Sequence, residues 1–230
     1  MTSRSDILTG RARTSDYGNQ FIGIYGACND KLALIGINCS PKLERACKDA
    51  LAADVIRLSI SSSGLIGIYC ALNSNGAIVP STIEQSELKL LKKMGLRTHK
   101  VKGRFTACGN NVLANDKGAV VNPRIPRSEV KKISECLGVE AVQMKIADYN
   151  TVGAICEATN SGFLAHTRTS EEELEKLKSI LKVQGAIGTA NMGIPFLGLC
   201  IIANSRGYVV GEKTTGFELG RLEEGLGFID

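Results

Sequence analysis

Short apolar segments alternate with turn sequences along most of the chain. Residues 66–72 are apolar, residues 73–76 read Asn-Ser-Asn-Gly, and residues 77–80 are mainly apolar again. Asn and Gly tolerate the positive φ angles of tight turns, so this pattern predicts a β-hairpin whose first strand spans the whole segment 66–72.

An amphipathic segment follows this hairpin. Residues 81–84 read Ser-Thr-Ile-Glu, which resembles a capping box, and Leu88, Leu91 and Met94 follow at helical spacing. Residues 97–102 read Arg-Thr-His-Lys-Val-Lys, and alternate side chains of this segment would lie on opposite faces of an extended chain. This alternation predicts a third strand. The unit is therefore a ββαβ module. The same pattern predicts helices over residues 41–52, 127–137, 170–182 and 216–226, and third strands near 54–60, 140–146 and 183–189.

A fixed period runs through these modules. Five glycines, the anchor glycines, open the apolar segments at intervals of 44, 42, 44 and 45 residues: Gly23, Gly67, Gly109, Gly153 and Gly198. Six residues after them stand Asn29, Asn73, Asn115, Thr159 and Asn204, for which we predict turn roles. Twenty residues after the last four stand Glu87, Glu129, Glu173 and Glu218. This regularity indicates five copies of one structural unit.

The five units are expected to form a closed ring. One ββαβ unit cannot bury both the apolar face of its sheet and that of its helix, and closure removes most exposed strand edges. The fifth unit lacks a third strand after its helix, whereas residues 10–16 stand at the corresponding offset before Gly23, so we predict that the N-terminal strand closes the ring. We assign residues 10–230 to one domain with repeats at about 22–60, 66–103, 107–147, 152–190 and 197–230, and residues 1–9 to a disordered extension.

Composition narrows the class of protein. The apolar stretch 183–200 is interrupted by polar residues and falls short of the roughly 20 apolar residues of a membrane span. Residues 1–17 lack the apolar core of a secretory signal, so we expect a cytoplasmic protein. The eight cysteines include no Cys-x-x-Cys pair, which predicts reduced core residues rather than a disulfide framework or a zinc site.

The net charge of +5 favours an anionic partner such as RNA, but it is spread along the chain. Phe105 is the one aromatic residue set among basic residues. The cations that could contact RNA are Lys92, Lys93, Arg97, Lys100, Lys102 and Arg104. The alternative is a solvated helix end and edge strand, which is the commoner fate of such residues.

Several segments resemble the translation initiation factor six family over about residues 20–230. They include Ala-Cys-Gly-Asn-Asn at 107–111, Thr-Val-Gly at 151–153, Gly-Thr-Ala-Asn-Met-Gly at 188–193 and Thr-Thr-Gly-Phe-Glu-Leu at 214–219. The resemblance implies the pentein fold, an α/β (α+β) five-bladed propeller of ββαβ repeats with pseudo-fivefold symmetry. Met192 stands where relatives more often carry a basic residue, and the absence of a long acidic or Ser-rich tail after Asp230 resembles the archaeal form.

The same resemblance implies a function without chemistry. Members of this family bind the large (50S) ribosomal subunit, against ribosomal protein uL14 and near the sarcin-ricin loop of the rRNA, and keep the small subunit from joining. Asn110 matches the family's motif and is the first candidate for ribosome binding, with Ile68, Thr151 and Asn191 at related positions. The alternative for Asn110 and Asn191 is a turn role. We expect a monomer without cofactor or metal, and a possible part in large-subunit biogenesis.

The rival hypothesis is an enzyme, since some penteins modify amidines with a Cys nucleophile and a His. Only His99 and His166 are available, and His166 is followed by Thr-Arg rather than by an acid two residues on. Cys70, Cys156 and Cys200 follow their anchor glycines by two or three residues in three units, as core packing predicts. These positions favour a binding protein over an enzyme.

Overall fold

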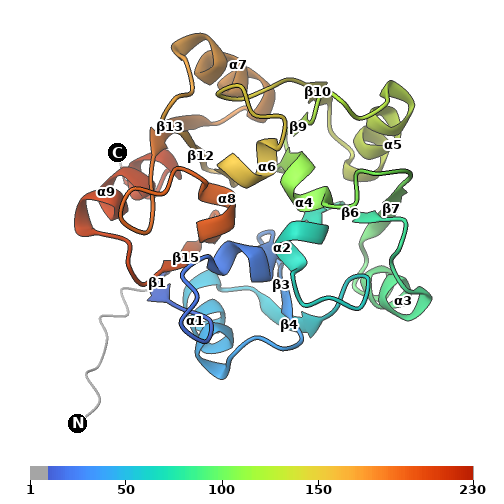
Figure 1. Cartoon of the computed structure of the whole chain (residues 1–230), viewed down its shortest axis with the longest axis horizontal. Helices are drawn as coiled ribbons and strands as arrows, with labels where there is room; N and C mark the ends of the chain where they lie inside the picture. The colour runs from blue at the N-terminus through green and yellow to red at the C-terminus, as the bar shows by residue number, and fades with distance from the viewer. Residues whose placement is uncertain (1–9, 230) are drawn as a thin grey trace.

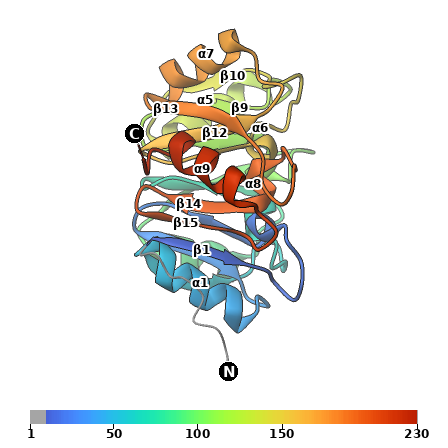
Figure 2. The same ribbon diagram turned by 90° about the vertical axis from the view of Figure 1, so that its left-hand side faces the viewer.

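Five similar units surround a central axis in the computed structural model, which describes residues 10–229 (Figure 1). Each unit contains a three-stranded sheet whose middle strand pairs antiparallel with the first strand and parallel with the third. A longer helix lies at the outside of each unit and a one-turn helix lies beside the axis (Figure 1). Strands such as β12, β14 and β15 run along the axis (Figure 2). The α/β five-bladed propeller predicted from the repeat is confirmed.

The elements follow one order in every unit. The first unit comprises η1 (Ile22–Tyr25), β2 (Gly26–Cys28), β3 (Leu32–Gly36), α1 (Pro41–Leu51) and β4 (Asp54–Leu58). The second comprises α2 (Ile66–Tyr69), β5 (Ala71–Leu72), β6 (Gly76–Pro80), α3 (Gln85–Lys93) and β7 (Arg97–Val101). The third comprises α4 (Cys108–Asn111), β8 (Val112–Ala114), β9 (Ala119–Val121), α5 (Arg127–Leu137) and β10 (Ala141–Gln143). The fourth comprises α6 (Val152–Ile155), β11 (Cys156–Ala158), β12 (Gly162–His166), α7 (Glu171–Leu181) and β13 (Gln184–Gly188).

The fifth unit combines both ends of the described chain. It comprises α8 (Leu197–Cys200), β14 (Ile201–Asn204), β15 (Gly207–Gly211), α9 (Gly216–Gly225) and, from the N-terminal end, β1 (Arg11–Thr14). Strand β1 pairs in parallel with β15, with Arg11 opposite Tyr208 and Thr14 opposite Gly211. The predicted closure by the N-terminal strand is therefore confirmed. The prediction for residues 1–9 lies outside the described residues.

The start of each apolar segment differs from the prediction. Residues 66–72 are predicted as one strand, but Ile66–Tyr69 is a helical turn and only Ala71–Leu72 is a strand. The other units show the same arrangement. A short apolar run suits a buried strand and a buried helical turn equally well, so its periodicity does not separate the two. The module is a one-turn helix followed by ββαβ.

The anchor glycines explain why a helical turn stands at the axis. A Cβ atom on Gly67 would overlap the carbonyl oxygen of Gly23. The same overlap, between an added Cβ atom and the carbonyl oxygen of the preceding anchor glycine, occurs at every step around the ring. The pairs of Cβ-bearing and carbonyl residues are Gly109 and Gly67, Gly153 and Gly109, Gly198 and Gly153, and Gly23 and Gly198. Each one-turn helix thus approaches its neighbour more closely than a side chain permits. These glycines serve close packing of backbones.

Each hydrophobic core is shared by two neighbouring units. Leu34 and Leu58 of the first unit pack with Ile66 and Leu91 of the second. The fifth unit is joined to the first in the same way, since Ile202 lies in the core that contains residues of η1, β3 and α1. The helix and sheet of one unit therefore depend on the next unit for burial, as the repeat predicts.

The outer helices follow their sequence signals with one exception. Ser170 and Thr215 form capping boxes at the starts of α7 and α9. The capping box predicted at residues 81–84 is wrong, because α3 begins only at Gln85 with Glu84 as N-cap and Glu87 as its partner. Residues 80–83 instead form a hydrogen-bonded turn that delays the helix.

The recurring glutamates join the outer helices of the second to fifth units to the loop that enters the same unit. Glu87 accepts hydrogen bonds from Ser61 N (2.8 Å) and Ser62 N (2.9 Å). Glu218 accepts in the same way from Met192 N (3.2 Å) and Gly193 N (2.7 Å). These carboxylates are structural acceptors for strained loops, a role that their spacing alone did not reveal.

Asparagine side chains link successive hairpin turns at one end of the ring. The Asn115 oxygen accepts from Lys117 N and Gly118 N, each at 2.9 Å, and its amide donates to Thr159 O and Leu181 O, each at 2.9 Å. Asn29, Asn73 and Asn204 continue this ladder from turn to turn. The turn roles predicted for these asparagines are confirmed.

Substitution of Asn115 measures the strength of this ladder. Asn115→Ala leaves two N–H groups and two carbonyls unpaired in a buried place, so we expect the free energy of unfolding to fall by about 2–3 kcal/mol. Asn115→Thr reproduces Thr159, whose hydroxyl still accepts from Ser161 N and Gly162 N, and should lose about half as much. Urea denaturation measures both, and equal losses would contradict this account.

Candidate docking face

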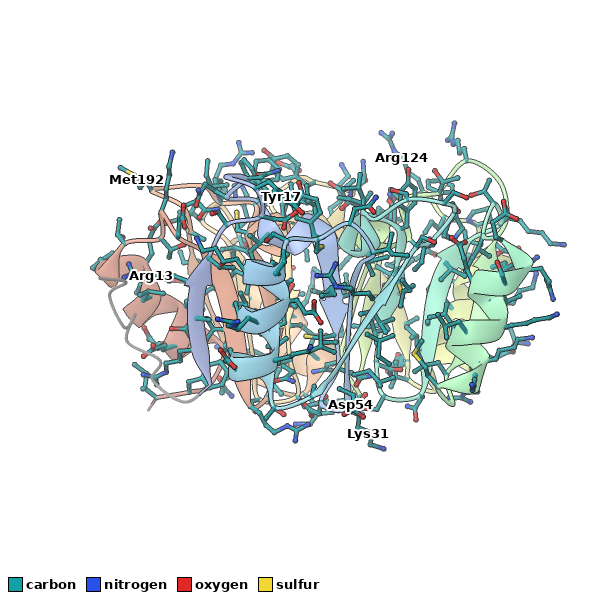
Figure 3. The ribbon with its side chains drawn as sticks, turned by 90° about the horizontal axis from the view of Figure 1, so that it is seen from below. Arg13, Tyr17, Lys31, Asp54, Arg124 and Met192 are labelled. Atoms are coloured by element: carbon teal, nitrogen blue, oxygen red, sulfur yellow. The ribbon has the colours of Figure 1, made fainter. Side chains whose placement is uncertain are left out.

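The ring has two ends of different chemistry. One end, the loop face, carries the loops that lead into the one-turn helices: residues 15–21, 59–65, 102–107, 145–151 and 189–196. The other end, the hairpin face, carries the turns at 29–31, 73–75, 115–117, 159–161 and 204–206. Figure 3 shows Tyr17, Arg124 and Met192 at the loop face and Lys31 and Asp54 at the hairpin face.

The centre of the loop face is apolar except at one position. The residue after each anchor glycine lies in a one-turn helix beside the axis (Figure 1), and the five are Ile24, Ile68, Asn110, Ala154 and Leu199. All of them except Ala154 are partly exposed. Asn110 is therefore the one polar side chain among five equivalent places.

Adjacent asparagines have different roles in α4. The Asn111 amide donates to Ala107 O (2.8 Å), and its oxygen accepts from the amide of Asn122 (2.6 Å). Asn110, by contrast, makes no side-chain hydrogen bond within residues 10–229. The turn interpretation fits Asn111, while the Asn110 amide is available to a partner.

Two further candidates lie close to Asn110 in the ring. Ile68 is its counterpart in α2, which contacts α4. Thr151 directly precedes α6, its side chain does not cap that helix, and it is partly exposed. The structure thus brings Asn110, Ile68 and Thr151 to one face around the axis.

Asn191 occupies a different position from the other candidates. Its side chain is 7% exposed, its amide donates to Gln20 O (2.9 Å), and its oxygen accepts from the Thr214 hydroxyl (3.3 Å). The backbone of Asn191 is left-handed, with φ of 53°. This residue joins the fifth unit to the first and presents little surface to a partner.

An apolar area on the loop face escaped sequence reasoning. Its members are large side chains from the fifth and first units: Tyr17 (78% exposed), Phe21, Ile37, Met192 (71% exposed) and Phe217 (82% exposed). Only Tyr17 and Phe21 share a loop, and the other members come from segments far apart in the chain, so no single sequence window contains the group. Exposed apolar residues gathered on one face are typical of protein-binding surfaces.

The hairpin face is closed by a polar ring that satisfies itself. Asp116 accepts from Ser74 N and the Ser74 hydroxyl, each at 2.7 Å, and from the Asn160 amide at 2.8 Å. Asp30 accepts from the same amide (2.7 Å) and from the Ser205 hydroxyl (2.6 Å). Because these groups bind one another, this face offers fewer free polar atoms at its centre.

A small cavity of about 70 Å³ lies on the axis between the two faces. Glu157 is the one ionisable carboxyl among its lining residues, in a position that Ala27, Ala71, Leu113 and Ile202 fill in the other units. Burial raises the pKa of Glu157 to about 8. A glutamate in a short strand gave no sequence signal of this location.

The cysteines and histidines have structural surroundings. Burial raises the pKa of Cys70 and of Cys200 to about 12, so these thiols stay protonated. His166 accepts from Arg168 N (3.0 Å) through Nδ1, and His99 bonds Glu129 (2.9 Å). Within residues 10–229, no cysteine thiol is hydrogen-bonded to a histidine ring, the arrangement that activates a nucleophile.

The helices of the described residues are short. The longest, α1, α5 and α7, have 11 residues each. No helix between residues 10 and 229 is long and apolar enough to cross a membrane. The same part of the chain contains no group of three or more His, Cys, Asp or Glu side chains that could hold a metal ion.

The ring of five units with its axial glycines defines a pentein-type propeller, and comparison with known proteins refines this class. Residues 11–225 match the eIF-6 family. The chain is 40% identical over 222 residues to Translation initiation factor 6 of Thermococcus onnurineus, covering 94% of this chain and 97% of that protein. It is 38% identical to the same factor of Pyrococcus horikoshii (93% and 97% covered) and 37% identical to that of Thermoplasma acidophilum (93% and 98% covered). The chain belongs to the eIF-6 family, as the resemblance indicated.

Proposed function

We propose that this protein is a cytoplasmic translation initiation factor that binds the large ribosomal subunit through its loop face and keeps the small subunit from joining. The mechanism is steric occlusion, so it requires a rigid body and a broad contact but no reaction and no cofactor. Rigidity is supported by the closed contacts between anchor glycines and by the cores shared between units. A standard interface of about 1,600 Å² in total would suffice.

The observation that carries the proposal is the position of Asn110. It is partly exposed at the centre of the loop face, its amide lacks a partner within the described residues, and apolar side chains stand at the equivalent positions. A polar side chain surrounded by apolar ones is typical of an interface residue whose hydrogen bonds fix the orientation of the bound partner. The apolar side chains of the fifth and first units extend the same surface.

The resemblance supplies the expected neighbours on the ribosome. We propose ribosomal protein uL14 as the protein partner, beside the sarcin-ricin loop, with the factor bound as a monomer. Occupancy of this place during large-subunit biogenesis follows from the same contact. Co-sedimentation with isolated archaeal large and small subunits tests the proposal, followed by a subunit-joining assay. Binding to neither subunit would overturn it.

The contribution of Asn110 is tested by Asn110→Ser. We expect the affinity for the large subunit to fall about 10-fold or more, because a central interface side chain is shortened. The melting temperature should stay within about 2 °C of the wild type, since the amide has no partner inside the protein. Gln184→Ser, an exposed amide at the hairpin-face end of β13, is the matched control. Equal affinities for both variants would contradict the assignment of Asn110.

A further inference from the structure

Positive side chains gather on one half of the loop face. Six exposed cations follow the ends of strands β7, β9, β10 and β12: Lys102, Arg104, Arg124, Arg127, Lys145 and Arg168. These six are called the basic half. The loops that carry five of them, residues 102–107, 122–126, 145–151 and 167–170, contain a single acidic residue, Asp148, and Arg127 is the first residue of α5. Figure 3 shows Arg124 on the loop face, at the opposite end from Lys31.

The charges of these cations remain available to a partner. Within residues 10–229, none of the six forms a salt bridge, although nine other pairs do. Two guanidinium groups are held by aromatic residues. Arg104 lies 5.5 Å from the ring centre of Phe105, and Arg168 lies 5.4 Å from that of Tyr149 and donates a hydrogen bond to the Tyr149 hydroxyl (2.8 Å). Stacking of this kind limits the motion of a guanidinium without neutralising its charge.

The other half of the loop face has different chemistry. The loops of the fifth and first units, residues 15–21, 37–40, 189–196 and 211–215, contain one cation, Lys213, and two carboxylates. They carry the exposed Tyr17 and Met192. Because the two halves differ in both charge and apolarity, one homogeneous partner surface cannot complement both.

We propose that the basic half binds the phosphodiester backbone of ribosomal RNA on the large subunit, while the apolar half and Asn110 contact protein. This inference rests on the proposed function. Four of the six cations are arginines, whose planar guanidinium groups suit phosphate oxygens. Their spread over four loops fits a chain of regularly spaced phosphates, and backbone contacts of this kind require no base recognition.

The test replaces three cations that make no side-chain hydrogen bond within the described residues. The loop-face variant carries Arg104→Ala, Arg124→Ala and Lys145→Ala. The control carries Lys31→Ala, Lys182→Ala and Arg206→Ala on the hairpin face, so both variants have the same net charge. Lys182 has a left-handed backbone that the equivalent Ala52 also adopts, which makes alanine acceptable there.

Affinity for purified large subunits is measured between 50 and 300 mM KCl. We expect the loop-face variant to bind about 10- to 100-fold more weakly at the lowest salt. The plot of log affinity against log salt should also become less steep by about 2, since each lost phosphate contact reduces the magnitude of its slope by roughly 0.7–0.9. The control variant should match the wild type in both quantities. Ultraviolet cross-linking should join wild-type peptides containing Arg104, Arg124 or Lys145 to rRNA.

Three outcomes separate the hypotheses. Unchanged affinity and slope in the loop-face variant would overturn the inference while the wild type still binds the large subunit. Carbodiimide cross-links from Lys145 to a protein carboxylate, without cross-links to rRNA, would assign the basic half to an acidic protein and also overturn it. Failure of the wild type to bind either subunit would instead remove the proposed function itself.

Discussion

Replacing Gly153 by alanine is expected to leave little folded protein. The added Cβ would overlap the carbonyl oxygen of Gly109 and lie 2.7 Å from that of Val112. Both are backbone atoms of the neighbouring unit, so no side-chain rotation relieves the clash. Because the ring is closed, a displaced α6 must also move α4 and α8. We expect a loss of more than about 4 kcal/mol, a large share of the usual 5–15 kcal/mol of stability.

A second glycine provides the control for this prediction. Gly220 lies inside α9, and a Cβ atom there would meet nothing within 4 Å. Gly220→Ala should therefore raise the free energy of unfolding by about 0.5–1 kcal/mol through helix propensity. Soluble yield and thermal melting followed by circular dichroism measure both variants. A Gly153→Ala protein that melts within a few degrees of the wild type would refute the axial packing argument.

The stability of this protein is expected to fall between about pH 5 and pH 8 because of Glu157. Its carboxyl faces the axial cavity, where the lining residues supply no cation, and burial raises its pKa to about 8. The Cys28 thiol lies near Glu157. The pKa of Cys28 is raised first by burial and then by the charge of the Glu157 carboxylate. Ionisation of Glu157 therefore places inside the ring a negative charge that a backbone hydrogen bond from Ala203 favours but that no cation of the cavity lining balances.

The sign follows from proton linkage. The unfolded chain releases the Glu157 proton near its ordinary pKa of 4.5, whereas the folded chain holds it to about 8. The stabilisation that Glu157 contributes is complete below pH 4.5 and is lost as the pH rises through 8. We expect the free energy of unfolding to fall by about 2–4 kcal/mol over this range, a figure that allows for water in the cavity.

Glu157→Gln isolates this effect from other titrating groups. The variant should equal the wild type near pH 4.5 and be more stable at pH 9, because glutamine keeps the shape of the neutral acid without ionising. Urea denaturation at both pH values measures the difference between the two proteins. A difference that does not change with pH would show that Glu157 does not carry the pH dependence.

Much of the fold could be predicted from periodic residues. Helix α5 has the predicted bounds, and α1, α7 and α9 begin and end within one residue of theirs. These segments are long enough for the apolar spacing to identify a helix. The one-turn helices could not be separated from strands, because four apolar residues carry no distinguishing period. The late start of α3 depends on a turn at residues 80–83 that competes with the capping signal.

The candidate docking face could be predicted only in part. The resemblance identified Asn110, and the structure shows its amide to be available; the same reasoning selected Asn191, whose amide bonds Gln20 O. The sequence predicts Lys102 and Arg104 as cations that could contact RNA, but it predicts neither the apolar area nor the basic half as a group. Most of their members come from loops that are tens of residues apart in the chain and share one face only when the ring closes.

By itself, the sequence determined the number of units, the order of elements in each and the use of the N-terminal strand to complete the fifth sheet. These properties depend on local patterning and on the repeat period, both of which are present in the linear chain. The tertiary structure alone decided that the anchor glycines meet backbone to backbone, that Glu157 faces an axial cavity and that cations and apolar side chains occupy opposite halves of one face. Each depends on contacts between units, and such contacts arise from packing around the axis rather than from neighbours in sequence.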